Sequence, residues 1–378
     1  MAPDLPTGAA AWRAVAREFC ERRLEPLAEQ IDREDRVPDT LVAGLRDARF
    51  LGLGLPIAWD GAGGDARSIS AVLEELSRGC PAVAVLVAVH LSVCAAPILE
   101  WGTDRQREKY LRPLARGEGI GAFGLTEPGA GSDTASLACR YAREGDGFVL
   151  RGTKMFTSNG ASAGAILIFA TRDPALGHHG ISAFIVPAGT PGFSVSQRLD
   201  KLGLRGSETT ELVLQNVRVP LDALLGPEGA GLKVALSALA GGRVGIASCA
   251  LGVAQAAFDE MLRAAQADDE PWKRTLVARA FVELSAARAL VERAAERKDA
   301  GASFVTEASA AKLAASRAAV AIASAGVDVA GPGGVRAGNR AGRLLRDARV
   351  FPIVEGTTEI QELILGRHLV EPGRFPNS

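Results

Sequence analysis

The stretch "GLKVALSALAGGRVGIASCALGVAQAAFDEMLRAAQ", Gly231 to Gln266, carries apolar residues at helical spacing over its whole length. Two further long stretches with the same period follow it, "RTLVARAFVELSAARALVERAAERKDA" and "TEASAAKLAASRAAVAIASAGVDVAG". Apolar positions that recur every three or four residues predict helices with a buried face. Three long helices and the C-terminal tail therefore predict an antiparallel helical bundle over residues 227–378.

The chain before this bundle changes to a period of two residues between Gly119 and Pro220. The segments "AILIFATR" and "ISAFIVPA" are typical of short buried strands, and "ELVLQNVRVP" alternates more clearly between apolar and polar residues. Gly-rich turns such as "EGDGF" and "GHHG" separate these segments. We therefore expect an antiparallel β domain over residues 119–226.

The N-terminal part, residues 1–118, returns to helical spacing in segments such as "AVAREFCERRLEPLAEQID" and "ISAVLEELSRG". Pro, Gly and Asp interrupt it at "RVPDT", "DGAGGD" and "GTDRQ", which indicates several helices with short joints. The expected fold is therefore mainly α with a central β domain, in the order helices, β domain, helical bundle.

Composition excludes several classes of function. Lys plus Arg is 43 and Asp plus Glu is 44, so the charge balance gives no reason to expect nucleic acid or an anionic membrane surface as a partner. The longest apolar run, Ala82 to Ala96, is broken by His90 and Ser92, so we expect no membrane span. Five scattered cysteines without a C-x-x-C spacing, and an N-terminus without a secretory pattern, indicate a cytoplasmic protein with reduced, mostly buried thiols. The four histidines offer no metal-ligand pair, so no metal site is expected.

A Gly-rich segment, "GAFGLTEPGAGSDTAS" from Gly121 to Ser136, is the first candidate for a ligand site. Gly129 and Gly131 allow backbone N–H groups to approach a ligand, and Thr126 and Ser132 add hydroxyl donors. The alternative is a plain loop between two domains. The segment is neither a Walker loop nor a dinucleotide fingerprint.

Two other segments have a structural and a functional interpretation. In "GTKMFTSNGA", Gly152 to Ala161, an ordinary strand end with Phe156 in the core is favoured on the residues alone. In "GGRVGIA", Arg243 lies on a largely apolar helix, and a buried arginine needs an anionic or dipolar partner. A salt bridge and a ligand contact are equally good interpretations there.

The segment "FPIVEGTTEIQELILGRHL", Phe351 to Leu369, places Glu355 directly before a glycine and a new helix. One interpretation is a helix N-terminus capped by Thr357 or Thr358, with acids that favour the helix dipole. The other is a general base held beside a pocket.

Five motifs in this order, "LTEPGAGSD", "KMFTSNG", "KLGLRGSETTELVLQNVRVP", "GRLLRDARV" and "VEGTTEIQELILGRHL", resemble the acyl-CoA dehydrogenase flavoprotein family. The resemblance extends from Arg17 to Leu369. It implies a helical N-terminal domain, a middle β domain and a C-terminal four-helix bundle. It also implies that FAD binds between the last two domains and a neighbouring subunit.

The resemblance implies that Glu355 removes the α-proton of an acyl thioester while the β-hydride passes to flavin N5. Substrate that desolvates Glu355 is expected to raise the pKa of its carboxyl group. Some relatives carry the base one residue before the arginine of the G-G-R helix. That position is Gly242 here, so Glu355 is the matching carboxylate.

The resemblance also places other residues at the cofactor and the substrate. The cofactor-binding residues that it implies are Phe123, Leu125, Thr126, Ser132, Phe156, Ser158, Gly331, Gly333, Gly334, Thr357 and Glu359. The substrate-binding residues that it implies are Ser132, Ala240, Arg243 and Gly356. The glycines of "GPGGV" correspond to the stretch that receives the FAD of a partner subunit.

The sequence departs from the family pattern at two places. Ala240 stands where the family usually has Asp, which affects the expected recognition of CoA. The segment "ADDEPWKRTLVARAF" replaces an Arg-x-Gln-Phe-Gly loop that clamps the neighbour's FAD. Asp268 and Asp269 would repel a pyrophosphate, so either Lys273 or Arg274 substitutes for the arginine or FAD binds more weakly.

The leading hypothesis is FAD-dependent dehydrogenation of an acyl-CoA in fatty acid or secondary metabolism. An electron-transferring flavoprotein is the expected acceptor, and a homotetramer or a dimer is the expected assembly. The alternatives are a dehydrogenase of carrier-protein-bound acyl groups, a flavin monooxygenase or oxidase, and a non-catalytic thioester-binding homologue with impaired FAD binding.

Overall fold

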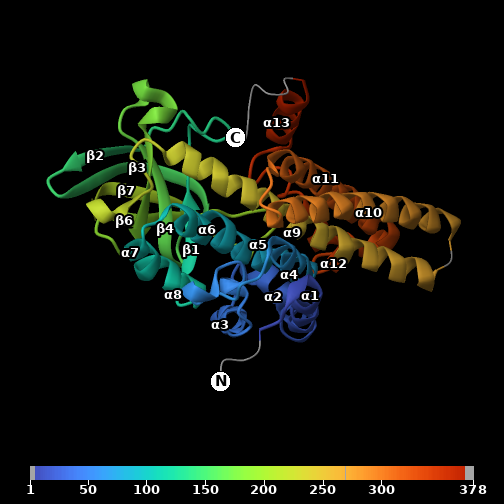
Figure 1. Cartoon of the computed structure of the whole chain (residues 1–378). Helices are drawn as coiled ribbons and strands as arrows, with labels where there is room; N and C mark the ends of the chain where they lie inside the picture. The colour runs from blue at the N-terminus through green and yellow to red at the C-terminus, as the bar shows by residue number, and fades with distance from the viewer. Residues whose placement is uncertain (1–4, 269, 371–378) are drawn as a thin grey trace.

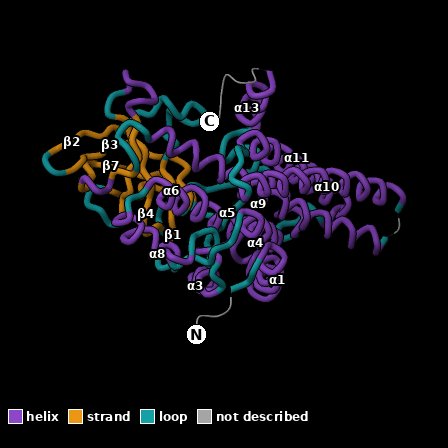
Figure 2. The backbone as a smooth tube through the Cα atoms, in the orientation of Figure 1, coloured by secondary structure: helices purple, strands orange, loops and turns teal. Residues whose placement is uncertain are grey.

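The computed structural model describes residues 5–268 and 270–370. Figure 1 shows a β-sheet at one end of the molecule and long helices at the other, with the N-terminal helices lying along one side of both. The helix α9 runs from the sheet towards the bundle and so connects the two ends. Strands are confined to the one end, as Figure 2 shows.

The N-terminal part is helical, as predicted. Its α-helices are α1 (Gly8–Phe19), α2 (Ala28–Glu34), α3 (Asp39–Asp47), α4 (Ala66–Gly79), α5 (Pro81–Val89), α6 (Ala96–Trp101), α7 (Asp104–Gln106) and α8 (Arg112–Ala115). Segments of π-helix continue or join them at η1 (Cys20–Leu24), η5 (His90–Ala95) and η6 (Arg107–Leu111). Short 3-10 turns occur at η2 (Glu25–Leu27), η3 (Phe50–Gly52) and η4 (Ile57–Trp59). The Asp65 side chain caps α4 by accepting from Ser68 N at 2.8 Å, which explains why the helix starts there.

The middle part is one eight-stranded sheet in the order β6-β7-β3-β2-β4-β5-β8, with β1 beside β4. The strands are β1 (Ile120–Gly124), β2 (Arg140–Glu144), β3 (Gly147–Ser158), β4 (Ala163–Thr171), β5 (Ile181–Pro187), β6 (Phe193–Arg198), β7 (Thr209–Pro220) and β8 (Leu224–Leu225). The predicted strands are therefore present. The sheet is mainly antiparallel, as expected, but β1 and β4 pair in parallel and β2 meets β4 in parallel at Arg140 and Thr171. A strand that arrives from a helical domain, as β1 does, is not bound by the hairpin rule that makes neighbours antiparallel.

In the described residues of the C-terminal part there are three long helices and two short ones. They are α9 (Gly231–Ala267), α10 (Pro271–Asp299), α11 (Val305–Ala330), α12 (Arg340–Ala348) and α13 (Thr358–Val370), and the 3-10 turn η9 (Gly331–Gly333) follows α11. Two other 3-10 turns, η7 (Pro174–Gly180) and η8 (Leu221–Ala223), lie in the middle part. The three long helices match the three periodic stretches of the sequence. At its start α9 lies against the sheet, where a Cβ on Gly231 would come within 2.6 Å of Ser182 Cα. A glycine is therefore required at this close approach.

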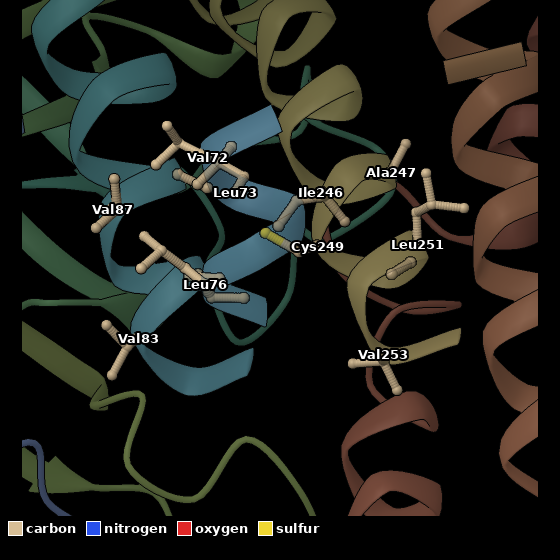
Figure 3. Packing of buried hydrophobic residues seen from close by; sticks show 14 of the residues in the cluster. Val72, Leu73, Leu76, Val83, Val87, Ile246, Ala247, Cys249, Leu251 and Val253 are labelled. Carbon is tan, nitrogen blue, oxygen red and sulfur yellow. The ribbon is translucent and has the colours of Figure 1, made fainter. Parts of the chain in front are cut away.

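Apolar packing joins the N-terminal helices to the bundle. In Figure 3, Val72, Leu73 and Leu76 of α4 and Val83 and Val87 of α5 lie in one apolar cluster with residues of α9. From α9 the buried residues of this cluster include Ile246, Cys249, Leu251 and Val253. Because α9 is buried along most of its length, it cannot shift without disturbing both neighbouring parts. It is therefore a rigid support for side chains near its middle.

Buried polar contacts, such as those of His90 and Asp347, connect the middle β domain to the helical parts. His90 lies between Leu51 O, 2.8 Å from its Nε2, and Gly121 N, which donates to its Nδ1 at 2.9 Å. Burial lowers the pKa of His90 to about 4, so the ring is neutral and acts as a structural link. Leu204 N donates to Asp347 Oδ1, and burial raises the pKa of that carboxyl to about 7.

The expectation that no apolar run reaches the length of a membrane span is wrong by length and composition. Pro81–Trp101 is one continuous helical segment of 21 residues, and Gly231–Ala267 and Val305–Gly333 are also long and apolar enough to cross a membrane. In the folded chain the most apolar window of Pro81–Trp101 is 83% buried by other parts of the protein. Its apolar character is therefore accounted for by packing inside the fold. All five cysteines are buried and unpaired, as expected.

Candidate active site

Glu355 lies in the turn between α12 and α13, in a backbone conformation that few side chains adopt. Its φ is 56°, and φ of the following Gly356 is 89°. A non-glycine residue in the left-handed region costs on the order of 1–3 kcal/mol and persists where the surroundings hold it in place. Thr357 Oγ1 accepts from Ile360 N at 3.4 Å, so Thr357 caps α13. The helix cap at Thr357 is therefore confirmed, and the general-base interpretation of Glu355 stays a prediction.

The strained turn directs the Glu355 carboxylate at the middle of α9. A Cβ placed on Gly242 would lie 2.8 Å from Glu355 Oε2 and 3.1 Å from Val93 Cγ1. The residue as a whole is half-buried, but its Oε2 is buried and has no hydrogen-bond partner among the described residues. A buried carboxylate oxygen without a partner is costly and is a common sign of a functional group. Gly242 stands where some relatives carry the base. Because it has no side chain, it leaves room for the Glu355 carboxylate.

Two cations surround the carboxylate. Arg243 on α9 is buried, makes no ion pair within the described residues, and leaves its Nε without a partner. Lys312 on α11 is fully buried. Burial raises the pKa of Glu355 to about 7, although the charges of Arg243 and Lys312 act to lower it. A carboxyl group that titrates near neutral pH suits general base catalysis.

Two side chains hold the Gly356 carbonyl, and the sequence did not single out either of them. Lys312 Nζ donates to Gly356 O at 2.7 Å, and Gln361 Nε2 donates to the same oxygen at 2.9 Å. Gln361 Nε2 also donates to Glu355 O at 3.4 Å. A buried lysine in an alanine-rich helix carries the same signal that drew attention to Arg243, so Lys312 could have been noticed.

The Gly-rich segment leaves the sheet at β1 and is anchored from below. Lys154 Nζ donates to Leu125 O at 3.1 Å and to Glu127 Oε1 at 2.6 Å, and all of these groups are buried. Met155 N donates to Thr126 O at 2.8 Å, so the segment continues along β3. Phe123 is half-buried and packs on Phe169 with ring centroids 4.9 Å apart. The start of the segment is therefore rigid.

The tip of the Gly-rich segment is open. A Cβ on Gly129 or Gly131 would meet nothing within 4 Å, and Ser132 is exposed. The glycines are thus not required by packing inside this chain. Open glycines above a rigid base are what a loop that receives a ligand on its backbone needs.

Phe156 contradicts the interpretation that placed it in the core. Its side chain is 62% exposed and its φ is 55°. The pairing of β3 with β7 shifts register between Lys154 and Thr157, so Phe156 is the bulged residue and turns outward. Ser158 follows it and is half-buried, and the buried Thr157 Oγ1 has no partner in the described part of the chain. A strained, exposed aromatic ring on a rigid strand is a platform for stacking.

The remaining predicted residues are distributed over both ends of the bundle. Ala240 is buried on α9, two residues before Gly242, while Glu359 is exposed in the first turn of α13. Gly331, Gly333 and Gly334 lie at the end of α11. From Lys312 to Gly331 the helical rise gives a separation of roughly 28 Å, so this glycine stretch does not reach Glu355 within one chain.

The α9–α10 junction does not offer Lys273 to a ligand. Lys273 is buried and its Nζ pairs with Asp268 Oδ2 at 2.8 Å. Its ammonium also lies 5.7 Å from the centroid of the Trp272 ring. Asp269 falls outside the described residues. The lysine is therefore occupied by its own loop and is not a free replacement for the expected arginine.

A cavity of about 70 Å³ lies between α4, α5–α6 and α9. Its lining includes Gly241, Val244, Gly245 and Ser248 on one face of α9, and Leu73 and Ser92 opposite. Glu355 does not line it, but Gly241 adjoins the Gly242 position that faces the carboxylate. Among the described residues there is no group of three or more His, Cys, Asp or Glu side chains that could bind a metal ion.

Comparison with known proteins finds relatives for all three parts of the chain. Family models described as the acyl-CoA dehydrogenase N-terminal, middle and C-terminal domains match residues 8–118, 122–217 and 229–370. The chain is 40% identical to the short-chain specific acyl-CoA dehydrogenase of Bos taurus mitochondria, over 98% of this chain and 92% of that protein.

Two solved structures are similar over almost the whole length. Butyryl-CoA dehydrogenase from Megasphaera elsdenii has a TM-score of 0.94 and 35% identity, covering 98% of this chain and all of its own. A structure of the electron transferring flavoprotein of Acidaminococcus fermentans has a chain with a TM-score of 0.95 and 34% identity, covering 98% and 100%. These similarities extend across all three parts of the fold.

Proposed function

Because the chain belongs to the acyl-CoA dehydrogenase family, whose members dehydrogenate acyl-CoA with FAD, we propose that Glu355 is its catalytic base and that its substrate is a short-chain acyl-CoA. The observation that carries the first part is the strained turn that directs a carboxylate with a pKa of about 7 at Gly242. The relatives do not favour the alternative of a carrier-protein-bound substrate.

The groups of the turn suit removal of an α-proton. Deprotonated Glu355 accepts the α-proton, and its own backbone N–H, which donates no hydrogen bond within the described residues, is free to bind the thioester oxygen as negative charge develops there. Bound FAD supplies the acceptor for the β-hydride. One proton and one hydride leave the substrate, so an α,β-double bond forms.

The residues that the resemblance assigned to FAD fit such a cofactor. Phe156 offers an exposed ring on a rigid strand, and Gly129 and Gly131 leave open backbone beside the hydroxyl of Ser132. Leu125 and Thr126 lie on the anchored base of the same loop. We propose that these residues bind the cofactor of their own chain.

The assembly and the electron acceptor are further parts of the proposal. Gly331 to Gly334 lie too far from Glu355 to reach the same end of a cofactor, which supports a partner subunit's FAD at that place and hence a homotetramer or dimer. The similar chain in the structure of an electron transferring flavoprotein supports that class of protein as acceptor. Five buried, unpaired cysteines support a reducing compartment such as the cytoplasm.

The proposal for a short acyl chain rests on two observations. A close relative is specific for short chains, and the cavity beside Gly241 measures only about 70 Å³. A cavity of this size holds a few carbon atoms or waters and no long chain.

The test is anaerobic titration of the purified yellow protein with acyl-CoAs of increasing length, followed by flavin absorbance. Bleaching by butyryl-CoA at lower concentration than by octanoyl-CoA is expected. Preferential bleaching by octanoyl-CoA would refute the short-chain proposal, and bleaching only by a carrier-protein thioester would refute the acyl-CoA assignment.

A further inference from the structure

We propose that Lys312 is a positioning residue for the base, which fixes the Glu355–Gly356 turn through the Gly356 carbonyl and balances the charge of the Glu355 carboxylate. The inference rests on the proposed role of Glu355. It assigns a function to a side chain that neither the motifs nor the resemblance single out.

Lys312 is buried next to the turn that carries Glu355 and Gly356. Its side chain is fully buried on α11, between the buried Ala308, Ala311 and Ala315 of the same helix. Transfer of an ammonium group from water to such a site is expensive unless an acceptor and a counter-charge compensate it. The acceptor is Gly356 O at 2.7 Å. A lysine has three N–H donors, and this is the one hydrogen bond that it makes within the described residues.

The counter-charge comes from the site itself. The charged groups that act on Lys312 are Glu355 from the turn, Arg243 from α9 and Glu359 from the first turn of α13. Glu359 is exposed and is therefore screened by water. The exposed pair between Arg317 of α11 and Glu362 of α13 lies on the surface of the same two helices and satisfies itself. Glu355 is thus the buried anion that balances the buried lysine.

The turn needs both its fixed backbone and this charge. Gly356 O accepts from Gln361 as well as from Lys312, so a neutral side chain and a charged one hold the same oxygen. The neutral donor contributes only position. The lysine contributes position and also favours the ionised form of Glu355, because an opposite charge nearby lowers the pKa of a carboxyl group.

This difference gives a matched set of variants for the holoenzyme. The measurement is the pH dependence of kcat/KM with butyryl-CoA, together with flavin content and melting temperature. Lys312→Met removes the charge and the hydrogen bond at nearly constant volume. Lys312→Gln removes the charge but keeps a donor, Lys312→Arg keeps the charge, and Gln361→Leu removes only the neutral donor.

We expect the acidic limb of the profile to move upward by about one pH unit in Lys312→Met and Lys312→Gln, which is about a tenfold loss at pH values below the limb. Lys312→Arg is expected to keep the limb in place, and Gln361→Leu to lower kcat/KM without moving it. A purely structural lysine would lower kcat/KM by the same factor at every pH.

An unmoved limb in both charge-removing variants would overturn the inference. Should Lys312→Met fail to fold, Lys312→Gln carries the same requirement. The variant Glu355→Gln separates this inference from the proposed function. If the flavin of Glu355→Gln is still reduced by butyryl-CoA, Glu355 is not the base. If Glu355→Gln is inactive but the acidic limb does not move in the lysine variants, only the proposed role of Lys312 is wrong.

Discussion

The substitution Gly242→Ala is expected to slow flavin reduction while leaving the fold as stable as before or more stable. In a helix interior, Ala is favoured over Gly by about 0.5–1 kcal/mol. The new Cβ would lie 2.8 Å from Glu355 Oε2, whereas ordinary contacts begin at 3.4 Å, so the carboxylate must move. Because Oε2 is the end of a flexible side chain, and Val93 Cγ1 at 3.1 Å from the new Cβ must shift by only a few tenths of an ångström, the adjustment costs little stability. The required displacement is roughly 0.6 Å, and a misplacement of about 1 Å can cost about a hundredfold in rate.

We therefore expect a loss of about tenfold to a hundredfold in the rate constant for flavin reduction by butyryl-CoA, measured by anaerobic stopped flow, and an unchanged or higher melting temperature. Gly245→Ala is the matched control on the same helix, since its Cβ would make only an ordinary contact with Leu73 Cδ1 at 3.4 Å. A Gly242→Ala variant that folds normally and reduces flavin at the wild-type rate would refute the placement of the carboxylate.

Three other predictions follow from the site and its supports. The kcat/KM of the wild type should fall as the pH drops below about 7, because protonation of Glu355, whose pKa is raised to about 7 by burial, removes the base; a flat profile between pH 6 and 8 would contradict this. Lys154→Met should lower the free energy of unfolding, measured by urea titration, by about 3–5 kcal/mol, since it leaves the buried Glu127 without its cation. The double variant Lys154→Met/Glu127→Gln should recover part of this loss. Phe156→Ala should change stability by less than about 0.5 kcal/mol, because the ring is exposed, yet increase the rate of FAD loss on dilution, and equal retention of FAD would argue against stacking on Phe156.

The long helices and the alternating strands could be predicted because their signal is local. The apolar period of Gly231 to Gln266 continues without a break, and the observed α9 covers the same residues. The alternation of β7 is also visible as a burial pattern, which changes phase beside Asn216, where φ is 56°. In both cases each residue reports its own burial, so no knowledge of the partner element is needed.

Features that depend on tertiary context could not be predicted in this way. The parallel pairing of β1 with β4 depends on where the helical part delivers the chain, and no local pattern encodes this. The bulge that turns Phe156 outward inserts one residue without changing the apolar pattern of β3. Whether Lys312 faces water or the site depends on the rotation of α11 within the bundle. The resemblance supplied Glu355, while its strain, its approach to Gly242 and the lysine beside it required the structure.

The role of Glu355 as catalytic base is tested most directly by anaerobic mixing of the Glu355→Gln holoenzyme with butyryl-CoA. We expect this variant to keep its yellow flavin bands and its melting temperature but to show no flavin bleaching on the timescale of the wild type, because a carboxamide cannot accept the α-proton. Bleaching at a near-normal rate would mean that another group removes the α-proton and that Glu355 is not the base.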